Sequence, residues 1–100
     1  MKGRLVNGPN DCVQPGDYTL PMKGYTGDKL ATFFLKPNSR DEGVPQFARS
    51  VQHVTFPPHE YTIESDGTLT ISPSISDKRT GSDVSDGWHG YLRKGVWELA

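Results

Sequence analysis

At 100 residues the chain has the length of one domain, and folding at this size buries roughly 65% of the surface of the unfolded chain. Eleven basic and twelve acidic residues give a formal net charge of −1, which provides no positive field for nucleic acid and little self-repulsion to favour disorder. An apolar content of 33%, with eleven glycines and eight prolines, predicts one loop-rich domain of short strands over residues 1–100, with residues 1–16 as an extended N-terminal arm.

The single cysteine and the first residues of the chain bear on the compartment. Cys12 has no partner for an intramolecular disulfide, so the fold needs no oxidising environment. The N-terminus lacks the apolar run of a signal peptide, and no later segment approaches the roughly 20 apolar residues of a membrane span. We expect a cytoplasmic protein without a membrane anchor.

In the first half of the chain, apolar runs end at Pro and Gly, which is typical of short strands. Residues 17–20 (DYTL) predict an edge strand, and residues 30–35 (LATFFL) predict a buried one. One helical turn is expected near residues 46–49, followed by a strand over residues 51–56 (VQHVTF).

The second half contains two hairpin patterns. Alternating apolar residues on both sides of Ser65-Asp66-Gly67 predict a hairpin over residues 60–71, with Gly67 in the left-handed conformation. A second hairpin joins residues 88–92 to residues 96–99 through Arg93-Lys94-Gly95. Between them, residues 72–86 predict an exposed loop, because Ser, Asp, Thr and Gly dominate.

Many short strands with frequent turns predict an all-β fold, a small antiparallel β-sandwich or barrel-like domain with long loops. With so few apolar residues, the core must depend on aromatic side chains. Those expected in it are Phe33, Phe34, Phe56, Tyr61, Trp88 and Trp97.

The histidines are the first residues to consider for a metal. His53 and His59 are six residues apart across a Pro-Pro pair, which does not match the helical spacing of zinc hydrolases, and no cysteine pair completes a structural site. The sequence therefore predicts no metal and no cofactor. A bound metal would use His59, Glu60 and His89, the set that a small metal-dependent hydrolase would need.

No nucleophile has an activating neighbour in the sequence. Cys12 follows Asp11, and a nearby carboxylate raises the pKa of a thiol and lowers its reactivity. Ser72, Ser74 and Ser76 lie outside any G-x-S-x-G pattern, so we interpret them as turn residues.

Carboxylates gather in the long polar segment as Asp77, Asp83 and Asp86, interleaved with Lys78 and Arg79. Their spacing does not follow the EF-hand pattern, which favours a solvated loop over a calcium site. Asp77, Arg79 and Asp83 are nevertheless candidates for contacts with a partner.

The best candidate for a recognition surface lies in the last hairpin. Strand alternation places Trp88 and Leu92 on one face and His89 and Tyr91 on the other. If the first face belongs to the core, the second presents an imidazole and a phenol to a partner. We predict a binding surface from His89 and Tyr91, together with Trp88 and Trp97.

The order D-G-x-L-T-I-S-P-S-I, a polar loop, G-W-H-G-Y-L, a short turn and G-V-W resembles small uncharacterised proteins of bacteriophages and prophages, the DUF6527-like family, over about residues 59–98. Part of that family has an upstream knuckle, F-x-C-P-x-C. At residues 34–39 this chain has FLKPNS, which keeps the proline and lacks both cysteines. The resemblance therefore implies a phage-encoded protein, in the host cytoplasm or the virion, without the zinc of that knuckle.

We expect a non-enzymatic protein-binding module, either a virion component or an inhibitor of a host defence or metabolic protein. The small β fold, the near-neutral charge and the lack of a catalytic set support it. The alternative is the metal-dependent hydrolase described above. Homo-oligomers are also compatible with the sequence, since the edge strand over residues 17–20 could pair between subunits.

Overall fold

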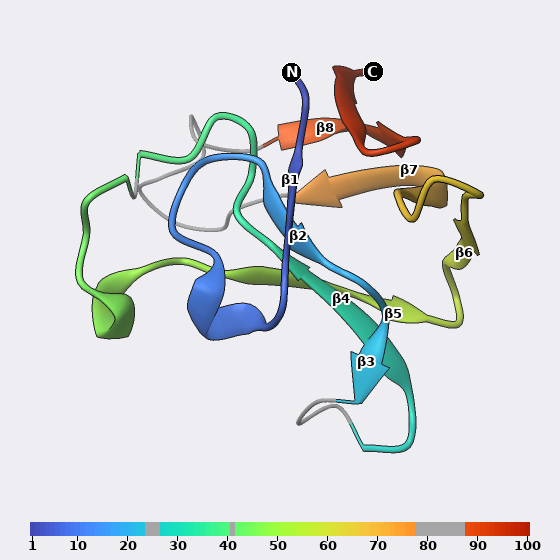
Figure 1. The fold of residues 1–100 in the computed structure, drawn as a ribbon, viewed down its shortest axis with the longest axis horizontal. Helices are drawn as coiled ribbons and strands as arrows, with labels where there is room; N and C mark the ends of the chain where they lie inside the picture. Colours follow the sequence, from blue (N-terminus) through green and yellow to red (C-terminus); the bar gives the residue numbers. More distant parts are fainter. Residues whose placement is uncertain (24–26, 41, 78–87) are drawn as a thin grey trace.

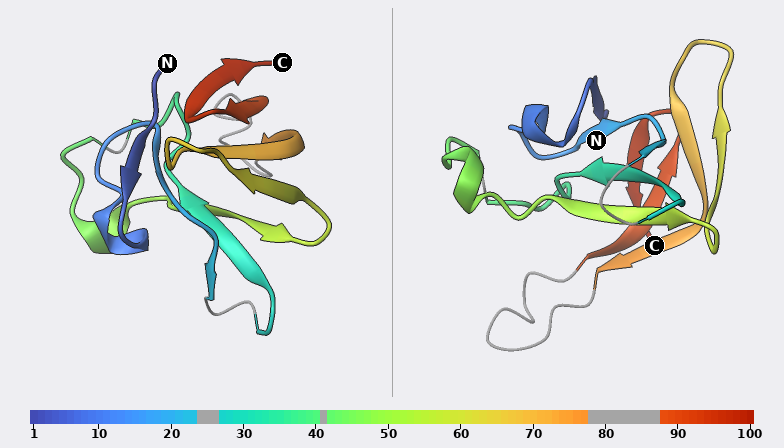
Figure 2. Two further views of the ribbon diagram at one scale, coloured as in Figure 1. Left: turned by 45° about the vertical axis from the view of Figure 1, so that its right-hand side comes forward. Right: turned by 90° about the horizontal axis from the view of Figure 1, so that it is seen from below.

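The chain folds into two β-sheets that pack together around one core (Figures 1 and 2). The computed structural model describes residues 1–23, 27–40, 42–77 and 88–100. The first sheet contains β1 (Arg4–Val6), β2 (Asp17–Thr19), β3 (Met22–Lys23), β4 (Leu30–Phe34) and β5 (Gln52–Phe56). The second contains β6 (Glu60–Ile63), β7 (Leu69–Asp77), β8 (Trp88–Arg93) and β9 (Val96–Leu99). Short 3-10 helices, η1 (Pro9–Asp11) and η2 (Gln46–Ala48), lie in the connections. The prediction of a small all-β domain of sandwich type is confirmed.

In the first sheet, β4 is the central strand. It pairs antiparallel with β2 and β3 on one side and with β5 on the other. β2 lies between β4 and β1, which joins it in parallel, and all three of its residues are buried. The prediction that residues 17–20 form an edge strand is therefore wrong, and this segment offers no free edge to a second subunit. The parallel pairing of β1 with β2 brings together segments that are not adjacent in the sequence, so no local sequence pattern predicts it.

The second sheet is antiparallel throughout, in the order β6-β7-β8-β9. Both predicted hairpins are present. Gly67 has a φ of 85° in the first turn. In the second, Arg93 pairs with Val96, so the turn itself is Lys94-Gly95, with φ values of 50° and 74°. Two central residues with positive φ fit the type I′ turn that suits the twist of a tight hairpin.

The polar segment after the first hairpin is a strand over its first part. β7 continues to Asp77, with a register shift against β8 between Ile71 and Ile75. The prediction of a loop over residues 72–86 is therefore wrong for residues 72–77, because pairing with β8 outweighs the turn preference of Ser and Pro. The rest of that prediction falls on residues 78–86, outside the described residues.

The core draws side chains from both sheets. Its buried members are Tyr18, Phe34, Val54 and Phe56 from the first sheet and Leu69, Ile71, Ile75, Trp88, Leu92 and Trp97 from the second. Phe33 is also buried, on the opposite face of β4 from Phe34. Tyr61 departs from the prediction, because 39% of it is exposed, although its ring contacts the ring of Phe56 edge-on at a centroid distance of 4.8 Å.

The first residues of the chain connect the two sheets, although residues 1–16 were expected as an arm. The amino group of Met1 donates to the carbonyl of Trp97 at 3.0 Å, and the Trp97 amide donates back to the Met1 carbonyl at 2.7 Å. Gly3 donates to the carbonyl of Gly95 at 2.7 Å, and the next residues form β1 in the first sheet. This segment therefore extends the second sheet at β9 before it enters the first.

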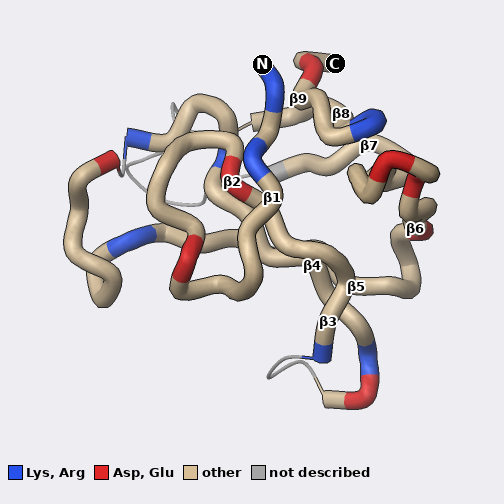
Figure 3. The backbone as a smooth tube through the Cα atoms, viewed as in Figure 1, with Lys and Arg blue, Asp and Glu red and all other residues tan. Residues whose placement is uncertain are grey.

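Charge is distributed unevenly along the fold. Residues 51–77 contain Glu60, Glu64, Asp66 and Asp77 and no Lys or Arg. Figure 3 shows acidic positions at β6 and at the turn that follows it. Although the chain is nearly neutral, acidic residues are therefore in excess at β6 and the turn that follows it.

Among the described residues, no helix has the length and apolar character that crossing a bilayer requires.

Candidate functional site

The outer face of the second sheet presents the predicted recognition residues. Trp88 and Leu92 point into the core, with 5% and 0% of their surfaces exposed. His89 is exposed and Tyr91 is partly exposed on the opposite face of β8. The predicted division of this strand is confirmed, and no described element covers the face that carries His89 and Tyr91.

Ser74 lies between two histidines on this face. Nε2 of His59 is 3.0 Å from the carbonyl oxygen of Ser74, and Nε2 of His89 is 2.8 Å from its hydroxyl. A carbonyl oxygen only accepts, so His59 donates from Nε2. His59 reaches this position from the corner between β5 and β6, where its amide donates to the carbonyl of Thr55. The two imidazoles thus connect Ser74 of β7 to β8 and to the corner that precedes β6.

Tyr91, Arg93 and Glu98 form a second unit on the same face. The guanidinium of Arg93 lies over the Tyr91 ring, 4.2 Å from its centroid, and donates to Glu98 at 3.2 Å. A cation over an aromatic face, fixed by a carboxylate, keeps both long side chains in one arrangement. Beside them, a shallow depression of about 540 Å³ opens between Pro73 and Val96.

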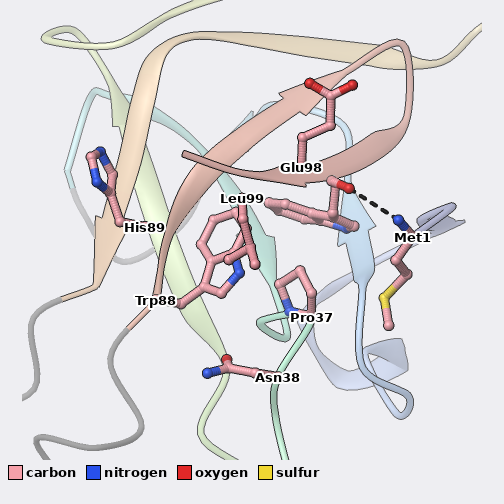
Figure 4. A pocket seen from close by; sticks show the side chains of 8 residues that line it. Met1, Pro37, Asn38, Trp88, His89, Glu98 and Leu99 are labelled. Carbon is pink, nitrogen blue, oxygen red and sulfur yellow. Dashed lines mark hydrogen bonds between the residues drawn. The ribbon is translucent and has the colours of Figure 1, made fainter.

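The tryptophans line a different hollow, shown in Figure 4. It measures about 560 Å³, and its walls include Trp88, Trp97, Leu99 and Pro37. His89 is at its margin and points away from the Trp88 indole in this view. The predicted binding residues are therefore divided, because both tryptophans belong mainly to the core and only His89 and Tyr91 face outward. Nothing in the described part of the chain shows what would occupy the hollow.

The hypothetical metal ligands His59, Glu60 and His89 do not come together as a set. In the described ranges, no three His, Cys, Asp or Glu side chains are arranged to hold a metal ion. The histidines approach Ser74 instead, and Glu60 is an exposed residue of β6. The geometry thus does not favour the metal site that the hydrolase alternative needs.

Most of the residues predicted to contact a partner in the polar segment lie outside the described residues. Asp77 is the last residue of β7 and pairs in register with Trp88. Arg79 and Asp83 lie outside the described residues, and so do the remaining residues up to 87.

Cys12 and Asp17 are two buried groups near the N-terminus whose pKa values depart from the ordinary ones. Burial, helped by the charges of Asp17 and Asp11, raises the pKa of Cys12 to about 12. Its sulfur remains a neutral thiol at pH 7, in agreement with the low reactivity expected from the sequence. Burial opposes ionisation of Asp17, but hydrogen bonds from Arg4, Gln14 and Val13 outweigh it and lower its pKa.

Sequence analysis did not find the role of Ser74 or of Arg93. The serines at positions 72, 74 and 76 were interpreted as turn residues, although they alternate as outward positions of a strand do. That alternation was a usable signal. Pro73 in its middle hid it, because proline is rare inside paired strands.

Comparisons with known proteins found no match, whether with family models, with curated proteins or with solved structures.

Proposed function

We propose that this protein is a non-enzymatic protein-binding module that uses the outer face of the second sheet. The observation that carries the proposal is the Tyr91–Arg93–Glu98 unit beside an open depression on an uncovered sheet face. Tyr and Arg are the residues that most often dominate binding energy at protein interfaces. Their fixed arrangement lowers the entropy lost on binding.

The surrounding residues support a polar, adaptable interface. Ser72 lines the depression beside Tyr91, and the hydroxyl of Ser74 bonds to His89 on the same face. Tyr and Ser together supply rigid contact area and flexible hydrogen bonding, as in the paratopes of antibodies. The face lacks the strong positive field that a nucleic acid would require.

The resemblance of residues 59–98 to phage proteins adds to the proposal that the protein is phage-encoded, and it indicates which kind of protein it would bind. A phage-encoded protein would work in the host cytoplasm or in the virion, and its partner would be a host or virion protein. The two settings differ in one observable, since a virion component is present in purified particles and an inhibitor is present only in infected-cell lysate.

The metal-dependent hydrolase alternative ranks lower, because in the described ranges His59, Glu60 and His89 do not gather into a ligand set. A hydrolase that uses a serine nucleophile is a separate possibility. The hydrogen bond between Ser74 and His89 resembles the first pair of a nucleophile and its base. A catalytic group of this kind needs a third residue to orient the imidazole, and among the described residues Ser74 is the one side chain that bonds to the His89 ring.

The proposal is tested by placing a photo-crosslinking amino acid at Tyr91 and irradiating cells in which the protein acts. We expect one dominant crosslinked protein from this position. A crosslinker at Lys23, an exposed residue of β3 in the first sheet, serves as the matched control. Equal crosslinking from both positions, or none from position 91, would contradict binding through this face.

Alanine variants then connect the crosslink to the proposed unit. Tyr91→Ala and Arg93→Ala should each weaken capture of the same protein about thirtyfold or more, because hot-spot truncations at an interface cost at least about 2 kcal/mol. Lys23→Ala should leave capture unchanged. Capture that survives both variants would exclude the Tyr91–Arg93 unit as the centre of the interface.

A further inference from the structure

Within the described ranges, the second sheet ends at β6, whose outer edge pairs with no further strand. In the described part of the chain, β6 has one neighbouring strand, β7, and all four of its residues are exposed. Proteins usually protect such an edge with Lys, Pro or a bulge, because it can accept another strand. Residues 60–63 (EYTI) contain neither Lys nor Pro, and their register against β7 is regular.

The register shows which backbone groups face outward. Glu64 donates its amide to the carbonyl of Thr68, directly beyond the last pair of the β6–β7 ladder. Hydrogen-bonded and non-hydrogen-bonded pairs alternate in an antiparallel ladder. Tyr61 and Ile63 therefore occupy the positions whose N–H and C=O groups point away from β7, towards the open edge.

The same two residues leave apolar surface at this edge. They pair with the core residues Ile71 and Leu69, so their side chains lie on the inner face of the sheet. Even so, 39% of Tyr61 and 51% of Ile63 is exposed. An added strand would cover this surface with its own inward-facing side chains.

The outer face of the edge is acidic. Glu60 and Glu64 lie two strand positions to either side of Thr62, and Asp66 follows in the turn. Glu64 accepts a hydrogen bond from Thr70. Asp66 accepts from Thr68, and these hydrogen bonds, together with the charge of Lys94, lower the pKa of Asp66. No Lys or Arg occurs between residues 51 and 77 to offset these carboxylates within the segment.

We propose that the β6 edge binds an extended segment of a partner protein in which basic and apolar residues alternate. The segment adds to the sheet as a further strand. Its apolar side chains pack on Tyr61 and Ile63, and its basic side chains face Glu60 and Glu64. This site is separate from the outer-face unit at Tyr91, so either surface can fail its test without the other.

A second copy of the chain fits this edge poorly. If two β6 strands paired antiparallel about Thr62, Glu60 of each copy would lie opposite Glu64 of the other. Like charges directly opposite one another destabilise a strand pair. Charge thus selects a basic partner over self-association.

The test uses the full chain and the synthetic peptide KVKIKVK, followed by amide hydrogen exchange in NMR spectra. We expect the peptide to slow exchange at the amides of Tyr61 and Ile63, while the amide of Thr62, which faces β7, changes little. Protection elsewhere, no protection at millimolar peptide, or protection that depends on protein concentration without peptide would overturn the proposal.

Two control peptides separate strand addition from simple charge attraction. The block sequence KKKKVVI has the same composition without alternation, and it should not protect Tyr61 or Ile63. N-methylation of alternate residues in KVKIKVK should abolish binding for one set and preserve it for the other, because every second amide of an added strand faces its neighbour. Equal effects of the two sets would rule out strand addition.

Charge variants of the protein complete the test. Glu60→Gln combined with Glu64→Gln should weaken peptide binding about fivefold at low salt, since each exposed charge pair contributes a fraction of a kcal/mol to about 1 kcal/mol. Asp28→Asn combined with Glu42→Gln, at exposed positions outside the second sheet, is the matched control. Binding that is equally sensitive to both double variants would contradict the site.

Discussion

The two sheets are held together by different means. In the first, buried polar side chains join segments distant in sequence: Asp17 accepts from Arg4 at 3.0 and 2.7 Å and from two backbone amides. Arg49, which is partly buried, donates to the carbonyls of Asn10 and Cys12, distant in sequence, and to that of the nearer Val44. The second sheet consists of strands that each pair with the next strand in the sequence, and short turns join β6 to β7 and β8 to β9.

The difference between the two sheets shows which strand pairings can be predicted from the sequence and which cannot. A hairpin is specified by alternation and by turn residues within about a dozen positions, so it is visible in the sequence. A sheet built from distant segments depends on a few polar side chains that satisfy one another only in the folded chain. Substitutions should therefore have unequal consequences in the two regions.

The largest effect is expected at Trp97, where the two sheets meet. Only 2% of it is exposed, its ring contacts Phe34 and Trp88, and its Nε1 donates to the carbonyl of Gly16 at 2.8 Å. Trp97→Ala should lower the free energy of unfolding by about 3–5 kcal/mol, as for other large core truncations. Urea denaturation followed by circular dichroism measures it.

The neighbouring Leu99 provides the control for that substitution. It is 76% exposed on the same strand, so Leu99→Ala should change the free energy of unfolding by less than about 0.5 kcal/mol. Because one core serves both sheets, Trp97→Ala should keep a single unfolding transition. Two separate transitions would show that the sheets are independent.

The ion pairs of the two sheets give the next contrast. The carboxylate of Asp17 is 1% exposed and receives four hydrogen bonds, whereas Arg93 and Glu98 are 56% and 48% exposed. Asp17→Ala should cost about 2–3 kcal/mol, because two backbone amides lose their acceptor, while Arg4 can turn to water. Glu98→Ala should cost at most about 0.5 kcal/mol. Similar losses in thermal denaturation of the two variants would contradict the contrast.

The pH dependence of the free energy of unfolding tests the role of Asp17 in a second way. The pKa of Asp17 is lowered in the folded chain, so its stabilisation is present above its ordinary value near pH 4 and is lost as the pH falls further. The free energy of unfolding of the wild type should therefore decline below about pH 4, and Asp17→Ala should decline less steeply. Parallel pH profiles for the two proteins would exclude Asp17 as the group responsible.

Effects smaller than those at Trp97 and Asp17 are expected at the turns of the second sheet. Gly67 has positive φ, but a Cβ there would meet no atom within 4 Å, so Gly67→Ala should cost about 1 kcal/mol from backbone strain alone. At Gly95 a Cβ would lie 2.9 Å from the hydroxyl of Tyr18 and 3.1 Å from Thr68. Gly95→Ala should therefore unfold at lower urea than Gly67→Ala, and the reverse order would contradict this packing.

The candidate site was partly predictable for the same reason. The inward and outward division of His89 and Trp88 follows from strand alternation, which is a local property. The approach of His59 and His89 to Ser74, and the stacking of Arg93 on Tyr91, depend on the register of three strands and on a corner after β5. A register is fixed by packing against the core, so it could not be predicted from these residues alone.

By itself, the sequence determined an all-β fold, both C-terminal hairpins, and the face on which His89 and Tyr91 lie, because turn chemistry and period-two alternation act over short distances. Only the tertiary structure decided that residues 17–19 are interior, that the N-terminal segment joins both sheets, and that β6 is left as an acidic edge. These features arise when distant strands compete for the same backbone hydrogen bonds and the same core, which is settled only when the whole chain has folded.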